Sequence, residues 1–310
     1  MTRSRRIGRR VGWALLVLAV LALAGLLGKT WSEAERLVTN PLATRKLPQK
    51  TPADFALDYR DVAVTTRDGL HLVGWYVPGH NGALVIAQHG YKSHRGEMLE
   101  EAQMLARHGY GVLLTSLRAH DRSDGETISF GKREGDDLDA WYRYALTLPG
   151  VDPRRIGILG NSMGAVIAIE YAARQPGLRA VVAHSPFSSL AETISTSVGY
   201  YTGLPAFPFA SLIQFWAERR LGLRAEDIDA KRWIGALGPR PVLILQGGAD
   251  VTVIPESGRR LYAAAREPKE LWFEPQLGHA NFDLKLPQDY ERRVVGFFDR
   301  ALAPTPVAGP

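Results

Sequence analysis

The chain has 310 residues, 45% of them hydrophobic and 23% charged, with a formal net charge of +6 and an isoelectric point near 9.5. This composition supports a sizeable core and excludes an intrinsically disordered chain. Five arginines lie in the first ten residues with no acid among them. Without them the rest of the chain carries only about +1, which excludes a nucleic-acid-binding charge pattern on the folded part. The absence of cysteine excludes disulfides, thiolate catalysis and cysteine-based zinc sites.

The first predicted element is a helix long enough to cross a membrane. Residues 11–28, VGWALLVLAVLALAGLLG, carry no charged or polar side chain and would extend about 27 Å as a helix. We expect residues 1–28 to be a single-pass anchor whose arginines stay in the cytoplasm, which places the remainder on the extracytoplasmic side. The alternative is a cleaved signal giving a secreted or periplasmic protein, since Ala22-Leu23-Ala24 is typical of a cleavage site. A buried helix of a soluble protein is the third possibility.

The rest of the chain predicts an α/β domain at 55–302, reached through a tether at 29–54 and followed by a disordered tail at 303–310. Two strands around Arg67-Asp68-Gly69 predict a hairpin over 61–77. Strands then alternate with helices, which predicts a mostly parallel sheet covered by helices on both faces. The strands are expected at 83–89, 110–117, 155–160, 178–184, 240–247 and 269–275, and the helices at 98–109, 134–147, 163–174, 256–266 and 287–302.

Residues 186–239 interrupt this alternation with an insertion rich in aromatic side chains and proline. Such an insertion after a strand is typical of a cap that covers a site, because ligand pockets are commonly lined by apolar and aromatic groups. The alternative is that the rings pack the insertion onto the sheet. The rings concerned are Phe187, Tyr200, Tyr201, Phe207, Phe209, Phe215 and Trp216.

The motif that indicates chemistry is Gly160-Asn161-Ser162-Met163-Gly164, which matches G-x-S-x-G with a strand before it and a helix after it. This context is the one expected for a nucleophile elbow, in which Ser162 is exposed above the sheet. Larger side chains at the two glycines would clash in so tight a turn. We therefore predict Ser162 as a nucleophile, not an ordinary turn residue, and the backbone N–H of Met163 as an oxyanion donor.

A serine nucleophile needs a base and an acid that orients the base. Among eight histidines, His279 directly follows the strand at 269–275, so it lies at the sheet edge where Ser162 emerges. Asp250 follows the preceding strand in LILQGGADVTVIP. The chain order Ser162, Asp250, His279 is the order expected for this arrangement.

The loop after the first parallel strand, QHGYKSHRGE, predicts the second oxyanion donor. Gly90 lets the backbone approach the site, and we assign the donor to the backbone N–H of Tyr91. The side chain of Tyr91 is alternatively only a wall of the pocket. His89 and His94 lie in the same loop, but their spacing assigns them no chemistry.

Four segments together resemble the α/β-hydrolase family over residues 55–302. They are QHGYKSHRGE, PGVDPRRIGILGNSMGA, LILQGGADVTVIP and LGHANF. The resemblance is greatest to the bacterial branch related to serine aminopeptidases and monoglyceride-lipase-like esterases. It implies an α/β-hydrolase fold with a helical cap. One loop departs from the family, because D-x-R-G-H-G-x-S is replaced by SLRAHDRS at 116–123. The role of the loop at 116–125 is therefore left open, and none is assigned to His120.

The resulting hypothesis is a serine hydrolase that cleaves a carboxylic ester of a small acyl substrate, of the carboxylesterase, lysophospholipase or acylglycerol lipase type. It requires no metal or cofactor and no nucleic acid, and its membrane contact is the N-terminal helix. An amidase or serine aminopeptidase would use the same triad with an acid for the substrate amine, for which Glu192, Glu218 and Asp227 are available. A non-catalytic binding protein on a hydrolase fold is the third hypothesis. The oligomeric state, the substrate groups and signal cleavage are not predicted.

Overall fold

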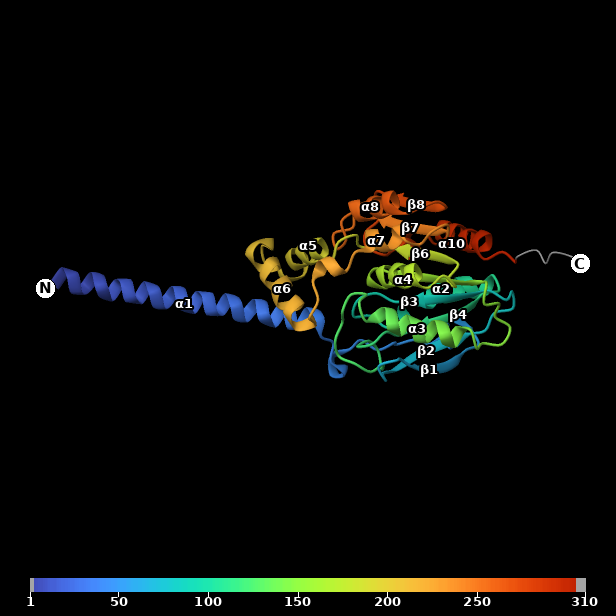
Figure 1. The fold of residues 1–310 in the computed structure, drawn as a ribbon, viewed down its shortest axis with the longest axis horizontal. Coiled ribbons are helices and arrows are strands. Elements are labelled where there is room, and N and C mark those ends of the chain that lie inside the picture. Colours follow the sequence, from blue (N-terminus) through green and yellow to red (C-terminus); the bar gives the residue numbers. More distant parts are fainter. Residues whose placement is uncertain (1–2, 305–310) are drawn as a thin grey trace, which may run out of the picture.

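An eight-stranded sheet of order β1-β2-β4-β3-β5-β6-β7-β8 forms the centre of the structure, a computed structural model that describes residues 3–304 (Figure 1). The predicted hairpin is formed by β1 and β2, and β2 also pairs antiparallel with β4, whereas all later neighbours pair in parallel. The mostly parallel sheet is therefore confirmed. The strands are β1 (Arg60–Thr65), β2 (His71–Val77), β3 (Leu84–Gln88), β4 (Gly111–Thr115), β5 (Ile156–Asn161), β6 (Ala180–His184), β7 (Val242–Gly247) and β8 (Lys269–Glu274).

Helices cover both faces of the sheet, as predicted, because side chains alternate along each buried strand. Leu84 and Ile86 of β3 pack into one core with α3, α4, α7 and α8, while Val85 and Ala87 pack into a second core with α2 and α10. The predicted tail lies outside the described residues from residue 305 on. The helices of the two layers are α2 (Leu99–Arg107), α3 (Glu134–Ala145), α4 (Met163–Arg174), α7 (Ala230–Gly235), α8 (Glu256–Ala264), α9 (Phe282–Lys285) and α10 (Pro287–Ala301).

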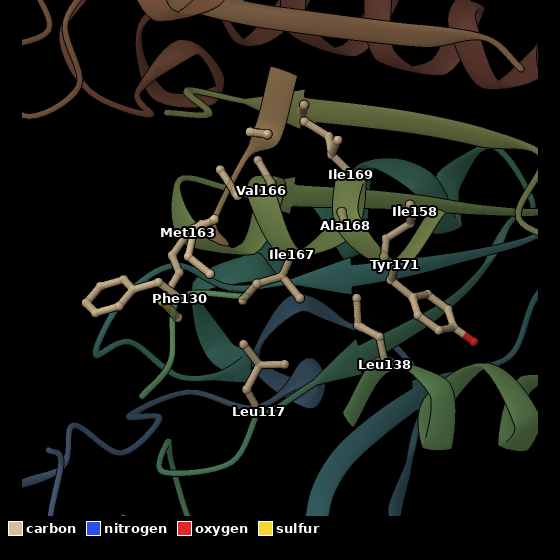
Figure 2. Packing of buried hydrophobic residues seen from close by; sticks show 14 of the residues in the cluster. Leu117, Phe130, Leu138, Ile158, Met163, Val166, Ile167, Ala168, Ile169 and Tyr171 are labelled. Carbon is tan, nitrogen blue, oxygen red and sulfur yellow. The ribbon is translucent and has the colours of Figure 1, made fainter. Parts of the chain in front are cut away.

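Helix α4 is the most enclosed of these helices, and its position fixes the site. The consecutive residues Val166 to Ile169 are fully buried. Figure 2 shows their side chains near Ile158 of β5, Leu138 of α3 and Leu117, which follows β4. Since a helix that is apolar on all sides must be surrounded by other elements, the start of α4 is held rigidly at the edge of the sheet.

The insertion after β6 is helical, as expected. It contains α5 (Leu190–Thr202), α6 (Ala206–Leu221), a short 3₁₀ turn (Ala225–Asp227) and α7. Helices α5 and α6 pack against each other, and α6 also packs against α1. Helix α7 instead contacts α4 and α8, so the last part of the predicted insertion extends the helical layer over the sheet. We call α5 and α6 the cap.

Helix α1 (Arg3–Val38) continues ten residues beyond the end predicted at residue 28. The start of the predicted tether is thus helical, because Thr30, Ala34 and Val38 form a buried stripe at helical spacing where α1 meets α6. Two 3₁₀ turns, Leu42–Thr44 and Pro52–Phe55, then lead into the sheet. Within the described residues, α1 is the helix long and apolar enough to cross a membrane, and its apolar stretch is entirely exposed. Figure 1 shows this stretch extending away from the globular part.

Candidate active site

Ser162 occupies a sharp turn between β5 and α4. Its backbone has φ +53° and ψ −116°, a conformation that a residue with a side chain adopts only where the surrounding structure imposes it. A Cβ atom at Gly160 would lie 2.4 Å from the carbonyl oxygen of Gly164, and one at Gly164 would lie 2.4 Å from the carbonyl oxygen of His89. The steric need for both glycines is therefore confirmed by the geometry.

The structure brings together the three side chains predicted from distant parts of the chain. His279 Nε2 lies 2.9 Å from Ser162 Oγ, and His279 Nδ1 lies 2.7 Å from Asp250 Oδ2. A carboxylate only accepts hydrogen bonds, so Nδ1 carries the proton and Nε2 accepts from the serine hydroxyl. The other oxygen of the buried Asp250 accepts from the backbone N–H groups of Thr252 and Val253, at 2.9 and 2.8 Å. These bonds orient the carboxylate toward the imidazole.

The loop that holds the predicted donor Tyr91 passes close to Ser162, since a Cβ atom at Gly90 would lie 3.5 Å from the serine Cβ. Two buried histidines fix this loop. His89 Nδ1 donates to the carbonyl oxygen of Gly90 at 2.8 Å, and His120 Nε2 accepts from the N–H of Lys92 at 3.0 Å. The carbonyl of Gly90 and the N–H of Tyr91 belong to one planar peptide, so the first bond fixes the direction of that N–H.

Both histidines are neutral in this arrangement, because each uses one ring nitrogen as donor and the other as acceptor. His89 Nε2 accepts from the N–H of Leu117, and His120 Nδ1 donates to the carbonyl of Arg118. Burial lowers the pKa of both imidazoles, and the neighbouring His89 lowers that of His120 further. The sequence pattern predicts no role for either histidine. The position of His89 directly after β3 was an available signal, but His120 lies five residues after β4, and the pairing between the two loops is visible only in the structure.

A second buried polar cluster lies behind the site. Burial, followed by the charge of Asp283, raises the pKa of Glu101 to about 8, and the hydroxyl of Tyr290 lies 3.4 Å from the Glu101 carboxyl. His184 packs against the ring of Tyr290. Burial, and then the charge of His279, lowers the pKa of His184 to about 3. A neutral imidazole therefore lies under the nucleophile turn.

A pocket of about 390 Å³ opens above Ser162 and His279, within the range of small-molecule sites. One face of α5 lines it along the whole helix, together with three residues of α1. The cap is therefore part of the pocket, but its lining is mostly aliphatic. Of the predicted rings, Phe187 lines the pocket, while Tyr200, Phe207 and Phe215 are exposed to solvent. The lining residues from these helices are Leu190, Thr193, Ile194, Ser197, Val198 and Thr202 of α5, and Glu33, Arg36 and Leu37 of α1.

The side chain of Tyr91 joins the end of α1 to the pocket. Its hydroxyl donates to the carbonyl of Leu37 at 2.7 Å, and its ring stacks on Phe130 at 5.6 Å between centroids. The ammonium group of Lys92 donates to the carbonyl of Arg36. The loop that carries the predicted donor is thus tied to α1, and the Tyr91 side chain is a wall of the pocket.

The carboxylates considered for binding a substrate amine lie elsewhere. Glu192 pairs with Arg260 at 2.7 Å, Glu218 accepts a backbone N–H, and Asp227 caps a turn. Among the described residues that line the pocket, the acids are instead Glu33 and Glu97. Glu33 is paired with two cations, and the Glu97 carboxylate accepts from the N–H of Gly90. In the part of the chain that the structure describes, no group of three histidine or acidic side chains could hold a metal ion.

Comparisons with known proteins agree with the fold. A family model described as serine aminopeptidase, S33, matches residues 79–212. An uncharacterized protein of Mycobacterium tuberculosis is 33% identical over 87% of this chain and 90% of its own length. The esterase Pf2001 of Pyrococcus furiosus has a similar structure, with a TM-score of 0.74 and 28% identity over 86% of this chain and 99% of that one.

Proposed function

The chain belongs to the α/β-hydrolase family and is a hydrolase, and we propose that it cleaves carboxylic esters through an acyl-enzyme on Ser162. The observation that carries this proposal is the continuous hydrogen-bond chain from Ser162 through His279 to Asp250. This chain supplies what a weak hydroxyl nucleophile needs, namely a base in contact and an acid that holds the base in the right tautomer.

In the proposed reaction His279 takes the proton of Ser162 as the oxygen attacks the ester carbonyl carbon. The carbonyl oxygen becomes an oxyanion, which the N–H groups of Tyr91 and Met163 stabilise. Met163 suits this role because it begins α4, where the first N–H groups have no acceptor within the helix. His279 then returns the proton to the leaving alkoxide. Water, deprotonated by the same imidazole, cleaves the acyl-enzyme and restores the serine.

The pocket supports an ester with an apolar acyl group. Its cap side combines the aliphatic side chains of Leu190, Ile194 and Val198 with hydroxyl groups, and its two acids already pair with cations or accept a backbone N–H. The structural similarity to an esterase points the same way. The second candidate, an amidase or serine aminopeptidase, is favoured by the family model that matches residues 79–212. A non-catalytic binding protein is disfavoured, because all three side chains of the triad are present and in contact.

The test is hydrolysis of p-nitrophenyl acyl esters by the full chain and by Ser162→Ala, with aminoacyl p-nitroanilides in parallel. We expect the variant to lose at least about 10³-fold in kcat and to lose labelling by a fluorophosphonate probe. Equal rates in the two proteins would remove Ser162 as the nucleophile. Faster cleavage of the anilides than of the esters would make the aminopeptidase the better assignment.

We also propose that α1 is retained as a membrane anchor with the catalytic domain on the extracytoplasmic side. The charge asymmetry of its N-terminal end supports this orientation. The intact mass of the protein extracted from membranes should equal that of the full chain. A mass that lacks the first 24 residues would instead establish the cleaved signal.

A further inference from the structure

The exposed aromatic side chains of the cap are concentrated near α1. Tyr200 at the end of α5 is 61% exposed, and Phe207 at the start of α6 is 82% exposed. Phe215 of α6 and Trp31 of α1 are about half exposed. Clustered apolar exposure of this kind marks an interaction surface, whereas single exposed side chains do not. We call residues 200–208 the cap tip.

The packing of α6 on α1 determines where the cap tip lies. The indole of Trp216 lies 3.3 Å from the Thr30 hydroxyl, and Arg220 pairs with Glu35 at 3.1 Å. Both contacts place α6 against residues 30–35 of α1, directly after its apolar stretch at 11–28. Figure 1 shows the connection between α5 and α6 at the end of the globular part that faces this segment.

The geometry points to a lipid bilayer as the occupant of this surface, and to a single-chain lipid ester drawn from that bilayer as the substrate. The apolar stretch of α1 is wholly exposed, and Trp31, just after it, contacts Trp216 of the cap, which in turn contacts the ring of Phe215. When α1 crosses a membrane, the cap tip lies at the level where the apolar stretch ends. Aromatic side chains are enriched at this interface because their rings suit the headgroup level. The cap tip then rests in the membrane surface.

The pocket connects this surface with the nucleophile. Its lining follows one face of α5 from Leu190, beside Phe187, to Thr202 at the cap tip. Twelve residues of helix correspond to about 18 Å. An extended acyl chain therefore lies along α5 with its ester carbonyl at Ser162 and its methyl end toward the bilayer. Glu33 and Arg36 of α1 close the opposite wall. This inference rests on the proposed function and specifies its substrate as one acyl chain esterified to a polar headgroup.

The activity test compares two esters with the full chain in phosphatidylcholine vesicles. One is a long-chain monoacylglycerol held in the vesicles, and the other is water-soluble p-nitrophenyl butyrate. The cap variant combines Tyr200→Ser, Phe207→Ser and Phe215→Ser, and its matched control combines Leu146→Ser and Leu284→Ser, at exposed sites away from the cap. We expect the cap variant to lose about tenfold on the vesicle ester only, and the control to lose nothing. Equal rates of wild type and cap variant on the vesicle ester would overturn the inference.

A second measurement does not depend on catalysis. The chain has no cysteine, so a single nitroxide can be attached at Phe207→Cys and, as a control, at Leu146→Cys. We expect the label at 207 to be accessible to oxygen and shielded from a water-soluble nickel complex, and the label at 146 to show the reverse. Water accessibility at 207, or spin–spin broadening that places a second copy of the chain there, would overturn the docking surface. If the wild type did not hydrolyse p-nitrophenyl butyrate, that result would count against the proposed function but not against the docking surface.

Discussion

The rim of the sheet and the cap contribute to the same pocket in different ways. At the rim, Ser162, Asp250 and His279 each follow a strand end and are fixed by bonds to the backbone or to one another. In the cap, α5 contributes a single face of a helix, and Ser195 and Thr196 on its other side are only half-buried. The predicted catalytic residues therefore lie where the backbone is held by close contacts, whereas the cap side of the pocket is formed by less buried helices.

The strongest test of this comparison introduces the same small side chain in both regions. At Gly164 the added Cβ would meet two backbone carbonyl oxygens at 2.4 and 2.6 Å, which cannot move aside. We expect Gly164→Ala to lower the free energy of unfolding by more than about 4 kcal/mol. A Cβ atom at Gly199 of α5 would have its nearest neighbouring atom 3.9 Å away. Gly199→Ala should therefore raise the free energy of unfolding by about 0.5–1 kcal/mol. Denaturant unfolding followed by circular dichroism measures the free energy of unfolding of both variants. Comparable losses of stability would contradict the distinction between a tightly packed rim and a more open cap.

The next effect concerns the orientation of the base. Asp250→Asn keeps the oxygen that accepts from Thr252 and Val253, so the loop should fold normally. The amide nitrogen that replaces Oδ2 cannot accept from His279, and the imidazole adopts the wrong tautomer. We expect kcat for p-nitrophenyl butyrate to fall by about 10³–10⁴-fold with unchanged stability. A loss of less than tenfold would show that Asp250 does not orient the base.

These rim features could largely be predicted from the sequence, because they follow from local sterics and from strand ends. The G-x-S-x-G pattern predicts the sharp turn at Ser162, and Asp250 and His279 directly follow predicted strands. The contribution of α1 to the pocket could not be predicted, since the contact between Thr30 and Trp216 joins residues 186 positions apart. The cap rings were expected inside the pocket, yet several face outward, because composition alone does not specify which side of a helix is covered.

A smaller loss is expected from the histidine that fixes the predicted oxyanion loop. His89→Leu removes the donor to the carbonyl of Gly90, so the N–H of Tyr91 loses its fixed direction. We expect kcat to fall by about 10–100-fold with little change in KM, less than the loss of a whole oxyanion donor. His89→Asn places an amide N–H near the position of Nδ1 and should recover most of the rate. Equal losses in the two variants would indicate a packing role only.

The smallest effect is on stability and involves the buried acid behind the rim. The carboxyl of Glu101 has its pKa raised from 4.5 to about 8, so between these values the folded state binds a proton that the unfolded state releases. Stability should therefore fall as pH rises through this range. Glu101→Gln should remove this dependence and be about 1–3 kcal/mol more stable than wild type at pH 8.5, with no gain at pH 4.

The control is Glu100→Gln, at an exposed position on the same helix. The groups facing Glu101 are Asp283, Tyr290, Glu97 and the amide of Asn161, and they are unchanged in both variants. Thermal unfolding at a series of pH values compares the three proteins. A pH profile of Glu101→Gln that parallels the wild type would show that this carboxyl is not protonated in the folded state.

The uninterrupted course of α1 has a consequence for how such enzymes diverge. The boundary between the exposed apolar segment and the hydrolase domain lies inside one helix, near Leu26, where its side chains begin to be covered. An N-terminal segment from another protein can therefore replace that of this chain only upstream of Leu26. A graft made after Val38 would retain every catalytic group and still lack one side of its binding cavity.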